Sequence, residues 1–276
     1  MFPRLQFLTL DASPLTHRAQ ALAALEGGVR WIQLRAKHLR EDVWTAEASA
    51  IAELCRDYGA TFVVNDSPRV ALRAEADGVH LGGDDASPAA ARALLGEFAI
   101  VGVTLNEPAH VARFAGTRVD YAGVGPFRHT ASKQKLAAIL TSESLASLIA
   151  TAAPLPCYAI GGVTSADWPT LRSLGAHGIA VSGAIALAAD PVSAAKSLVE
   201  AVSAEVSEAR AGQARLGSDC ASNDVSAPYR RPHLRLAPPH GHGQVCLRRA
   251  APRGARRLRR RGGDDGDQAR AFRRAG

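Results

Sequence analysis

Three basic side chains have the type and spacing expected of a site for an anionic group. Arg35 and Lys37 lie two residues apart at the end of a short apolar run, and Lys133 follows a later run. An arginine offers a planar fork of N–H donors and a lysine offers a point charge, and both suit phosphate oxygens. The sequence therefore predicts that these three cations bind a phosphorylated molecule.

Acidic residues follow two successive apolar runs. Asp66 comes after the run at 61–65, and Asp85, with Asp84 before it, comes after the run at 78–82. Carboxylates are hard oxygen ligands, and a site with few protein ligands beside cations is typical of Mg²⁺ that also binds substrate phosphates. We expect Asp66 and Asp85 to hold Mg²⁺ against a diphosphate.

Glycines mark the ends of the last two apolar runs. Gly161-Gly162 follows one of them, and Ser182-Gly183 follows the other. Backbone N–H groups at such positions, where a strand gives way to a helix, bind phosphate oxygens. These glycines predict a second site, for a monophosphate, distinct from the diphosphate site.

Each of these features also has a simpler interpretation. Arg35 and Lys37 are compatible with an ordinary solvated strand end, and Asp66 with a helix cap. Gly161-Gly162 alone is more often a plain turn than a phosphate site. The order and spacing of all the features together favour the binding interpretation.

Five histidines and two cysteines of the first 211 residues are predicted to be ordinary core or surface residues. His80 lies inside an apolar run and is predicted to be a core histidine with satisfied hydrogen bonds. Cys55 and Cys157 have apolar neighbours and are predicted to be core residues. Four other histidines are expected at the surface, namely His17, His38, His110 and His177.

Short apolar runs rich in β-branched residues alternate with stretches that have helical spacing. Strands are predicted at 5–10, 31–35, 61–65, 78–82, 99–104, 121–125, 157–161 and 178–182. Helices are predicted at 17–26, 42–57, 88–95, 107–115, 142–152, 165–174 and 190–208. Eight strands joined by helical crossovers predict an α/β fold with a closed parallel (β/α)₈ TIM barrel. Its chemistry sits at the carboxyl ends of the strands, where the polar residues above are found.

Charge is distributed unevenly along the chain, whose formal net charge is +7. Residues 1–211 hold 18 Lys and Arg against 21 Asp and Glu, whereas residues 212–276 hold 15 Arg against 5 Asp. Apolar periodicity also stops near Val206. We therefore predict a barrel domain at 1–211 and a disordered, basic Arg/Gly/Pro-rich tail at 212–276.

Several protein classes are disfavoured by the same sequence. No apolar run reaches the ~18 residues that cross a bilayer, and the first residues lack signal-peptide features. The four cysteines have no CxxC spacing, which argues against a zinc site or a disulfide framework. The Arg-rich tail is an alternative site for nucleic acid, but its only aromatic residues are Tyr229 and Phe272, which argues against this partner. We expect a cytoplasmic protein.

Together the motifs resemble those of one family, the thiamine-phosphate synthases. The matching segments are Gln33 to Lys37, Asn65-Asp66, Asp77 to Asp85, Asp120-Tyr121, Gly123 to Pro126, Thr130 to Lys133, Ile160 to Gly162 and Gly178 to Val181. They keep one collinear order over about residues 4–205 and exclude the tail.

The resemblance implies an enzyme that joins hydroxymethylpyrimidine diphosphate to thiazole phosphate and releases pyrophosphate. It implies that Mg²⁺ is bound by Asp66 and Asp85, and that Arg35, Lys37 and Lys133 assist catalysis. The pyrimidine diphosphate would be held by Gln33, Arg35, Lys37, Asn65, Thr104 and Lys133. The thiazole phosphate would be held by Thr130, Ser132, Gly162, Ser182 and Gly183. A homodimer is the arrangement typical of the family.

A related thiazole tautomerase is the alternative within the same family. It has a histidine after the glycine of the sixth strand, where this chain has Pro126. The chain also departs from many synthases at Asn106, which replaces a histidine, and at Gly183, which replaces a serine. The full set of cations and carboxylates favours the synthase.

Overall fold

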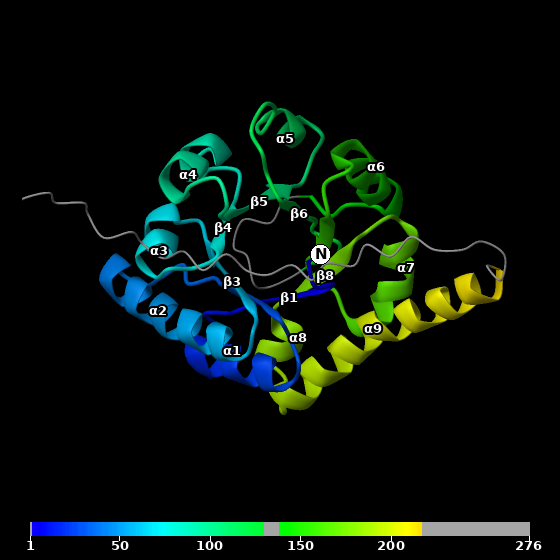
Figure 1. Cartoon of the computed structure of the whole chain (residues 1–276), viewed down its shortest axis with the longest axis horizontal. Coiled ribbons are helices and arrows are strands. Elements are labelled where there is room, and N and C mark those ends of the chain that lie inside the picture. Colours follow the sequence, from blue (N-terminus) through cyan, green and yellow to red (C-terminus); the bar gives the residue numbers. More distant parts are fainter. Residues whose placement is uncertain (1, 130–137, 217–276) are drawn as a thin grey trace, which may run out of the picture. The chain divides into compact units, whose positions relative to one another are not determined.

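The computed structural model describes residues 2–129 and 138–216, with side chains as far as residue 204. Its strands form a closed barrel in which each strand pairs in parallel with the next and β8 pairs with β1 (Figure 1). The strands are β1 (Leu5–Leu8), β2 (Trp31–Leu34), β3 (Thr61–Asn65), β4 (Gly78–Leu81), β5 (Ile100–Leu105), β6 (Tyr121–Val124), β7 (Cys157–Ile160) and β8 (Gly178–Val181).

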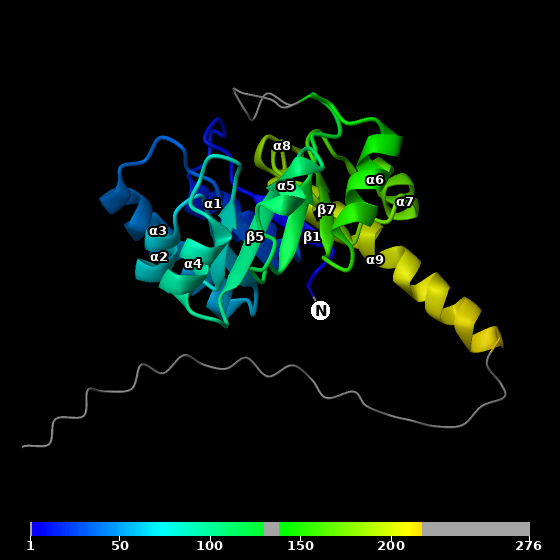
Figure 2. The same cartoon turned by 90° about the horizontal axis from the view of Figure 1, so that it is seen from above.

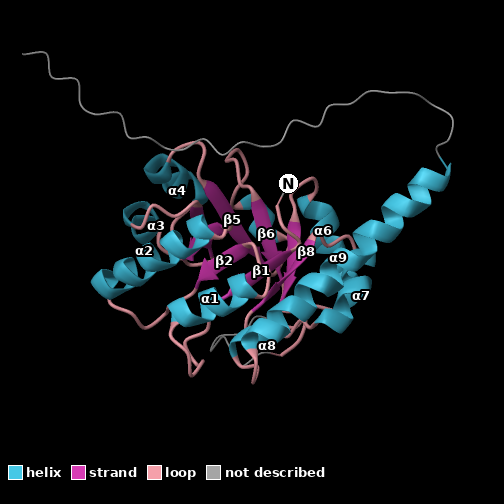
Figure 3. Cartoon of the chain, turned by 60° about the horizontal axis from the view of Figure 1, so that its bottom comes forward, coloured by secondary structure: helices cyan, strands magenta, loops and turns pink. Residues whose placement is uncertain are grey.

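Helices follow the strands and cover the outside of the barrel. They are α1 (His17–Glu26), α2 (Glu41–Asp57), α3 (Pro68–Arg73), α4 (Pro88–Leu95), α5 (Ala109–Ala112), α6 (Ser142–Ala152), the 3₁₀ turn η1 (Ser165–Asp167), α7 (Trp168–Ser173), α8 (Gly183–Ala186) and α9 (Pro191–Leu216). In Figure 2, α2 to α4 lie on one side of the barrel, and α6, α7 and α9 lie on the other. Figure 3 shows the strands enclosed by these helices. None of the described helices combines the length and apolar character needed to cross a bilayer.

Side-chain caps set where several helices begin. Thr16, Ser87 and Thr141 each precede a helix and accept a hydrogen bond from a backbone N–H of its first turn. Ser67 caps α3 in the same way. The alternative that Asp66 is this cap is therefore wrong. Asp66 instead has a φ of 67°, in the left-handed region, and lies in the turn between β3 and α3.

The apolar core has two parts. Strand side chains that point outward pack against the helices, and Cys55 and Cys157 lie in this layer, as predicted. Inside the barrel, Trp31, Tyr121 and Tyr158 pack edge to face. A Cβ on Gly102 would come within 2.2 Å of the Tyr121 ring, so the glycine in β5 makes room for this aromatic cluster.

The predicted (β/α)₈ barrel is confirmed, and the eight predicted strands coincide with β1 to β8 apart from a residue or two at their ends. The predicted helix at 107–115 is wrong in length, because only α5 forms there. Of the two short helices, α3 was predicted only as a helix start at Asp66, and α8 was not predicted. Helix α9 runs past residue 211 to Leu216. The chain divides into units at 1–220 and 221–276, and the second lies outside the described residues, so the disordered tail stays a prediction.

Candidate active site

A cavity of about 440 Å³ opens at the carboxyl ends of the strands. All eight strands or the loops that follow them contribute to its lining. The predicted site residues that line it are Gln33, Arg35, Lys37, Asn65, Asp66, Asp85, Thr104, Gly162, Ser182 and Gly183. Thr130, Ser132 and Lys133 lie outside the described residues. The structure thus brings together every predicted site residue that it describes.

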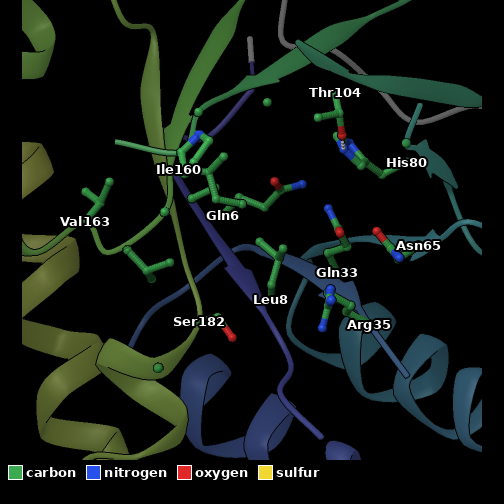
Figure 4. A pocket seen from close by; sticks show the side chains of 18 of the residues that line it. Gln6, Leu8, Gln33, Arg35, Asn65, His80, Thr104, Ile160, Val163 and Ser182 are labelled. Atoms are coloured by element: carbon green, nitrogen blue, oxygen red, sulfur yellow. Dashed lines mark hydrogen bonds between the residues drawn. The ribbon is translucent and has the colours of Figure 1, made fainter. Parts of the chain in front are cut away.

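The basic residues lie on the side of the cavity formed by β2 to β4. Figure 4 shows Arg35, Gln33 and Asn65 next to one another at this wall. The Lys37 ammonium contacts the Asp66 carboxylate directly. A diphosphate placed here would meet a guanidinium and an ammonium beside a carboxylate that is already paired with a cation.

Two carboxylates meet beside these cations. Asp85 accepts a hydrogen bond of 2.6 Å from the Gly82 N–H. Burial, together with a hydrogen bond with Asp66, raises the pKa of Asp85 to about 6. Both side chains line the cavity. Within the described residues, no cluster of three or more acidic, histidine or cysteine side chains is arranged for a metal ion.

A hydrogen-bonded chain forms the floor of the cavity. Gln6 Nε2 donates to the Tyr121 hydroxyl, which lies 3.0 Å from His80 Nδ1. His80 Nε2 lies 3.0 Å from Thr104 Oγ1. Burial raises the pKa of Tyr121 well above its ordinary range, so this phenol stays neutral. This series of hydrogen bonds fixes the Thr104 hydroxyl at the edge of the cavity.

His80 was predicted to be a satisfied core histidine, and its buried, hydrogen-bonded ring confirms this. Sequence reasoning missed that the same ring also lines the cavity and contacts Thr104. The contact with Thr104 forms only when β4 pairs with β5 in the folded barrel, so no local sequence pattern indicates it.

Glycines and a buried hydroxyl line the opposite side of the cavity, at the ends of β7 and β8. Gly161 and Gly162 have φ values of 100° and 64°, which favour glycine. Ser182 Oγ is buried and has no hydrogen-bond partner in the described part of the chain. In Figure 4, Ser182 lies apart from His80 and Asn65, across Leu8. This arrangement suits a second anionic group whose oxygen would complete the hydrogen bonding of Ser182.

An ion pair that sequence reasoning missed fixes the loop after β6 to this glycine turn. The Arg128 guanidinium donates to both carboxylate oxygens of Asp167 and to the Gly162 carbonyl oxygen. Asp167 also accepts hydrogen bonds from the backbone N–H and the hydroxyl of Thr164. The hydrogen bond from Arg128 lowers the pKa of Asp167 to about 2.

Three of the four histidines predicted at the surface are in fact half-buried or better covered. The His17 side chain is 11% exposed and that of His110 is 22% exposed, because each packs against a carboxylate of its own loop. His177 is half-buried and contacts the Phe2 carbonyl oxygen. His38 is exposed, as predicted.

The fold and the cavity define a (β/α)₈-barrel enzyme of the kind that works on phosphorylated small molecules at the carboxyl ends of its strands. The chain belongs to the thiamine monophosphate synthase family, whose model matches residues 9–185. The predicted family is therefore confirmed.

Individual relatives agree with this family assignment. The chain is 42% identical over 199 residues to the thiamine-phosphate synthase of Phocaeicola vulgatus, covering 71% of this chain and 96% of that one. It is 38% identical over 199 residues to the thiamine-phosphate synthase of Bacteroides fragilis, covering 71% and 98%. Among solved structures, thiamine phosphate pyrophosphorylase from Pyrococcus furiosus matches with a TM-score of 0.65 at 27% identity, covering 73% and 96%.

Proposed function

We propose that the chain is a thiamine-phosphate synthase, a transferase that joins hydroxymethylpyrimidine diphosphate to thiazole phosphate. The observation that carries this proposal is one cavity with two contrasting sides. Cations lie on the β2 to β4 side, and the β7 and β8 side has glycine turns and a buried hydroxyl that no described residue contacts by a hydrogen bond. A reaction of a diphosphate with a monophosphate needs such a pair of anion sites. The names of the curated relatives support the same activity.

In the proposed reaction, the bond between the pyrimidine methylene carbon and the diphosphate oxygen breaks with both electrons leaving on the oxygen. The thiazole nitrogen then donates its electron pair to that carbon, so the products are thiamine phosphate and pyrophosphate. The electron-rich aminopyrimidine stabilises the carbocation formed in between. No protein nucleophile is required, and what the chain supplies is charge neutralisation and orientation.

Arg35 and Lys37 neutralise the charge that grows on the departing diphosphate. Gln33 and Asn65, with amide groups in the same wall, orient the pyrimidine diphosphate. Thr104, fixed by His80, contributes a hydroxyl at the edge of the same wall. Together these residues position the reacting carbon toward the β7 and β8 side.

The carboxylate pair fits a magnesium ion. Asp66 and Asp85 would hold Mg²⁺, because they lie close together, are hard oxygen ligands, and leave other coordination positions for phosphate oxygens and water. When bound, the ion would add further positive charge where the diphosphate leaves.

The thiazole phosphate binds on the other side. The Ser182 hydroxyl donates to a phosphate oxygen, and backbone N–H groups near Gly162 and Gly183 surround the remaining oxygens. This orientation presents the thiazole nitrogen to the pyrimidine carbon across the cavity.

The test is to incubate the purified full chain with both substrates and Mg²⁺ and to identify the products by mass spectrometry. The proposal expects thiamine phosphate, and none when either substrate is omitted. Isomerised thiazole phosphate in place of thiamine phosphate would identify the tautomerase instead, and no product of either kind would contradict both.

A further inference from the structure

The segment after β2, which carries Arg35 and Lys37, is hydrogen-bonded to the residues that follow β1. The Thr9 N–H donates to the Gln33 carbonyl oxygen at 3.0 Å, and the Arg35 N–H donates to Thr9 Oγ1 at 3.0 Å. The Lys37 N–H donates to Asp11 Oδ2 at 3.2 Å. Side chains of Thr9 and Asp11 thus replace the backbone acceptors of a continuing strand.

The residues held in this way are the ones whose side chains enter the cavity. Gln33, Arg35 and Lys37 all line it, as expected when alternate residues of an extended segment face the same side. The position of both cations therefore depends on the orientation of Thr9 and Asp11.

One histidine contacts both of these anchors. His17, the first residue of α1, places Nδ1 2.9 Å from Thr9 Oγ1 and Nε2 3.2 Å from Asp11 Oδ1. Its side chain is only 11% exposed, and Thr9 is fully buried. A single ring thus bridges the two groups that hold the cation-bearing segment.

With Asp11 ionised and the His17 ring neutral, each donor of this network has one acceptor. An ionised Asp11 carboxylate can only accept, so His17 Nε2 carries a hydrogen and donates to it. In the neutral ring Nδ1 then accepts the Thr9 hydroxyl hydrogen. This leaves a lone pair of Thr9 Oγ1 facing the Arg35 N–H. Without His17, the Thr9 hydroxyl would lose the partner that fixes its rotation.

We propose that His17 is a positioning residue that acts through Thr9 and Asp11 to hold Arg35 and Lys37 against the diphosphate. The inference rests on the proposed function for the identity of the substrate. It predicts an effect on the diphosphate alone. The loop before α1 also contacts α8, because Ser13 Oγ donates to the Ala186 carbonyl oxygen. A general disturbance of this loop would therefore change KM for the thiazole phosphate as well, so that KM serves as the internal comparison.

The experiment compares His17→Ala with two variants that each preserve one arm. In His17→Asn, the amide oxygen can still accept from Thr9, and in His17→Gln, the amide nitrogen can still donate to Asp11. The measurements are KM for each substrate and calorimetric binding of inorganic pyrophosphate with Mg²⁺. His17→Ala should raise KM for the pyrimidine diphosphate and weaken pyrophosphate binding by roughly tenfold, the size of one or two lost hydrogen bonds. For His17→Asn and His17→Gln, KM for the pyrimidine diphosphate and pyrophosphate affinity should lie between the values for His17→Ala and for the unchanged chain.

A matched control and a second variant keep the result interpretable. His177→Asn removes another half-buried histidine, at the amino end of β8, and should change neither KM nor pyrophosphate binding. Thr9→Val removes the hydroxyl that His17 contacts. Because both residues act through the same contacts, the double variant with His17→Ala should bind pyrophosphate no more weakly than the weaker of the two single variants.

An equal rise in KM for both substrates would overturn the proposal, as would a lowered melting temperature with unchanged pyrophosphate affinity. Additive effects of Thr9→Val and His17→Ala would also overturn it. If the unchanged chain makes no thiamine phosphate, the proposed function fails, and the pyrophosphate measurement still decides the role of His17.

Discussion

Ser182 shows how one side chain can indicate a ligand. Its hydroxyl is buried at the β7 and β8 side of the cavity and has no partner among the described residues, which is costly unless another group supplies one. The neighbouring turn at Gly161 and Gly162 has positive φ values, and a Cβ at either position would collide with Pro126 or Arg128 of the loop after β6. At the residue scale, the missing hydrogen bond is itself the signal for a phosphate oxygen.

Replacement of Ser182 by alanine should weaken the binding of thiazole phosphate and leave the binding of the pyrimidine diphosphate largely unchanged. A hydrogen bond to a charged group contributes about 1.5–3 kcal/mol, so KM for the thiazole phosphate should rise about tenfold or more. KM for the pyrimidine diphosphate should stay within about twofold, since Ser182 does not reach it. Ser173→Ala, at an exposed serine of α7, is the control. A rise in KM for the pyrimidine diphosphate alone would contradict the assignment of Ser182 to the thiazole phosphate site.

Removal of either acidic side chain, in Asp66→Ala or Asp85→Ala, should reduce Mg²⁺-dependent turnover by about 10²-fold or more, because a metal ion contributes several kcal/mol to charge stabilisation. Initial rates at saturating substrate, with and without EDTA, measure this. Asp57→Ala, at the end of α2 and remote from the cavity, should retain full activity. Activity that survives EDTA would refute the magnesium site.

At the scale of elements, the ion pair of Arg128 and Asp167 connects the loop after β6 with η1. Because the Arg128 guanidinium lowers the pKa of Asp167 to about 2, the folded state holds this carboxylate ionised more strongly than the unfolded chain does. The stabilisation is therefore complete above the unfolded pKa of about 4 and is lost as pH falls toward 2.

Asp167→Asn should remove this pH dependence. The melting temperature of the unchanged chain should fall between about pH 4 and 2 more steeply than that of the variant, and the two should differ most near neutral pH. Arg128→Gln removes the same ion pair and should give a similar profile, with little further loss in the double variant. Parallel profiles for all of these chains would show that the pair contributes no pH-dependent stability.

The elements themselves were largely predictable, for reasons visible in particular segments. Strands such as Trp31–Leu34 and Gly178–Val181 are short apolar runs bounded by polar or glycine residues. Helix α8 was missed because four residues are too few to show helical periodicity. The six residues of α3 are also too few, and only the start of that helix was predicted, from the cap position at Asp66. The predicted helix at 107–115 forms only the single turn of α5, because propensity alone does not fix where a helix ends.

The site was predictable to the extent that its residues follow strand ends. Arg35, Asp66 and Ser182 are adjacent to strands in sequence, so the barrel topology brings them together. His17 was missed because its partners, Thr9 and Asp11, become neighbours only when α1 turns back toward β1. Arg128 and Asp167 likewise meet only in the folded chain.

For the whole molecule, the barrel is predicted to work without the Arg-rich tail. The buried side chains of α9 include Ala195, Leu198 and Val202, all of which precede residue 211. Truncation after Ala211 should therefore preserve the melting temperature within a few degrees and keep turnover near that of the full chain. Aggregation of the shortened chain, or loss of most of its activity, would place the domain boundary elsewhere.

The central claim is that one cavity binds a diphosphate on its β2 to β4 side and a monophosphate on its β7 and β8 side, and joins the two molecules. The most direct test is steady-state kinetics with both substrates varied, comparing the unchanged chain with Arg35→Ala. The unchanged chain should form thiamine phosphate and pyrophosphate in equal amounts. Arg35→Ala should show a large loss of kcat/KM for the pyrimidine diphosphate, with KM for the thiazole phosphate nearly unchanged. Absence of thiamine phosphate, or a loss that falls on the thiazole phosphate instead, would contradict it.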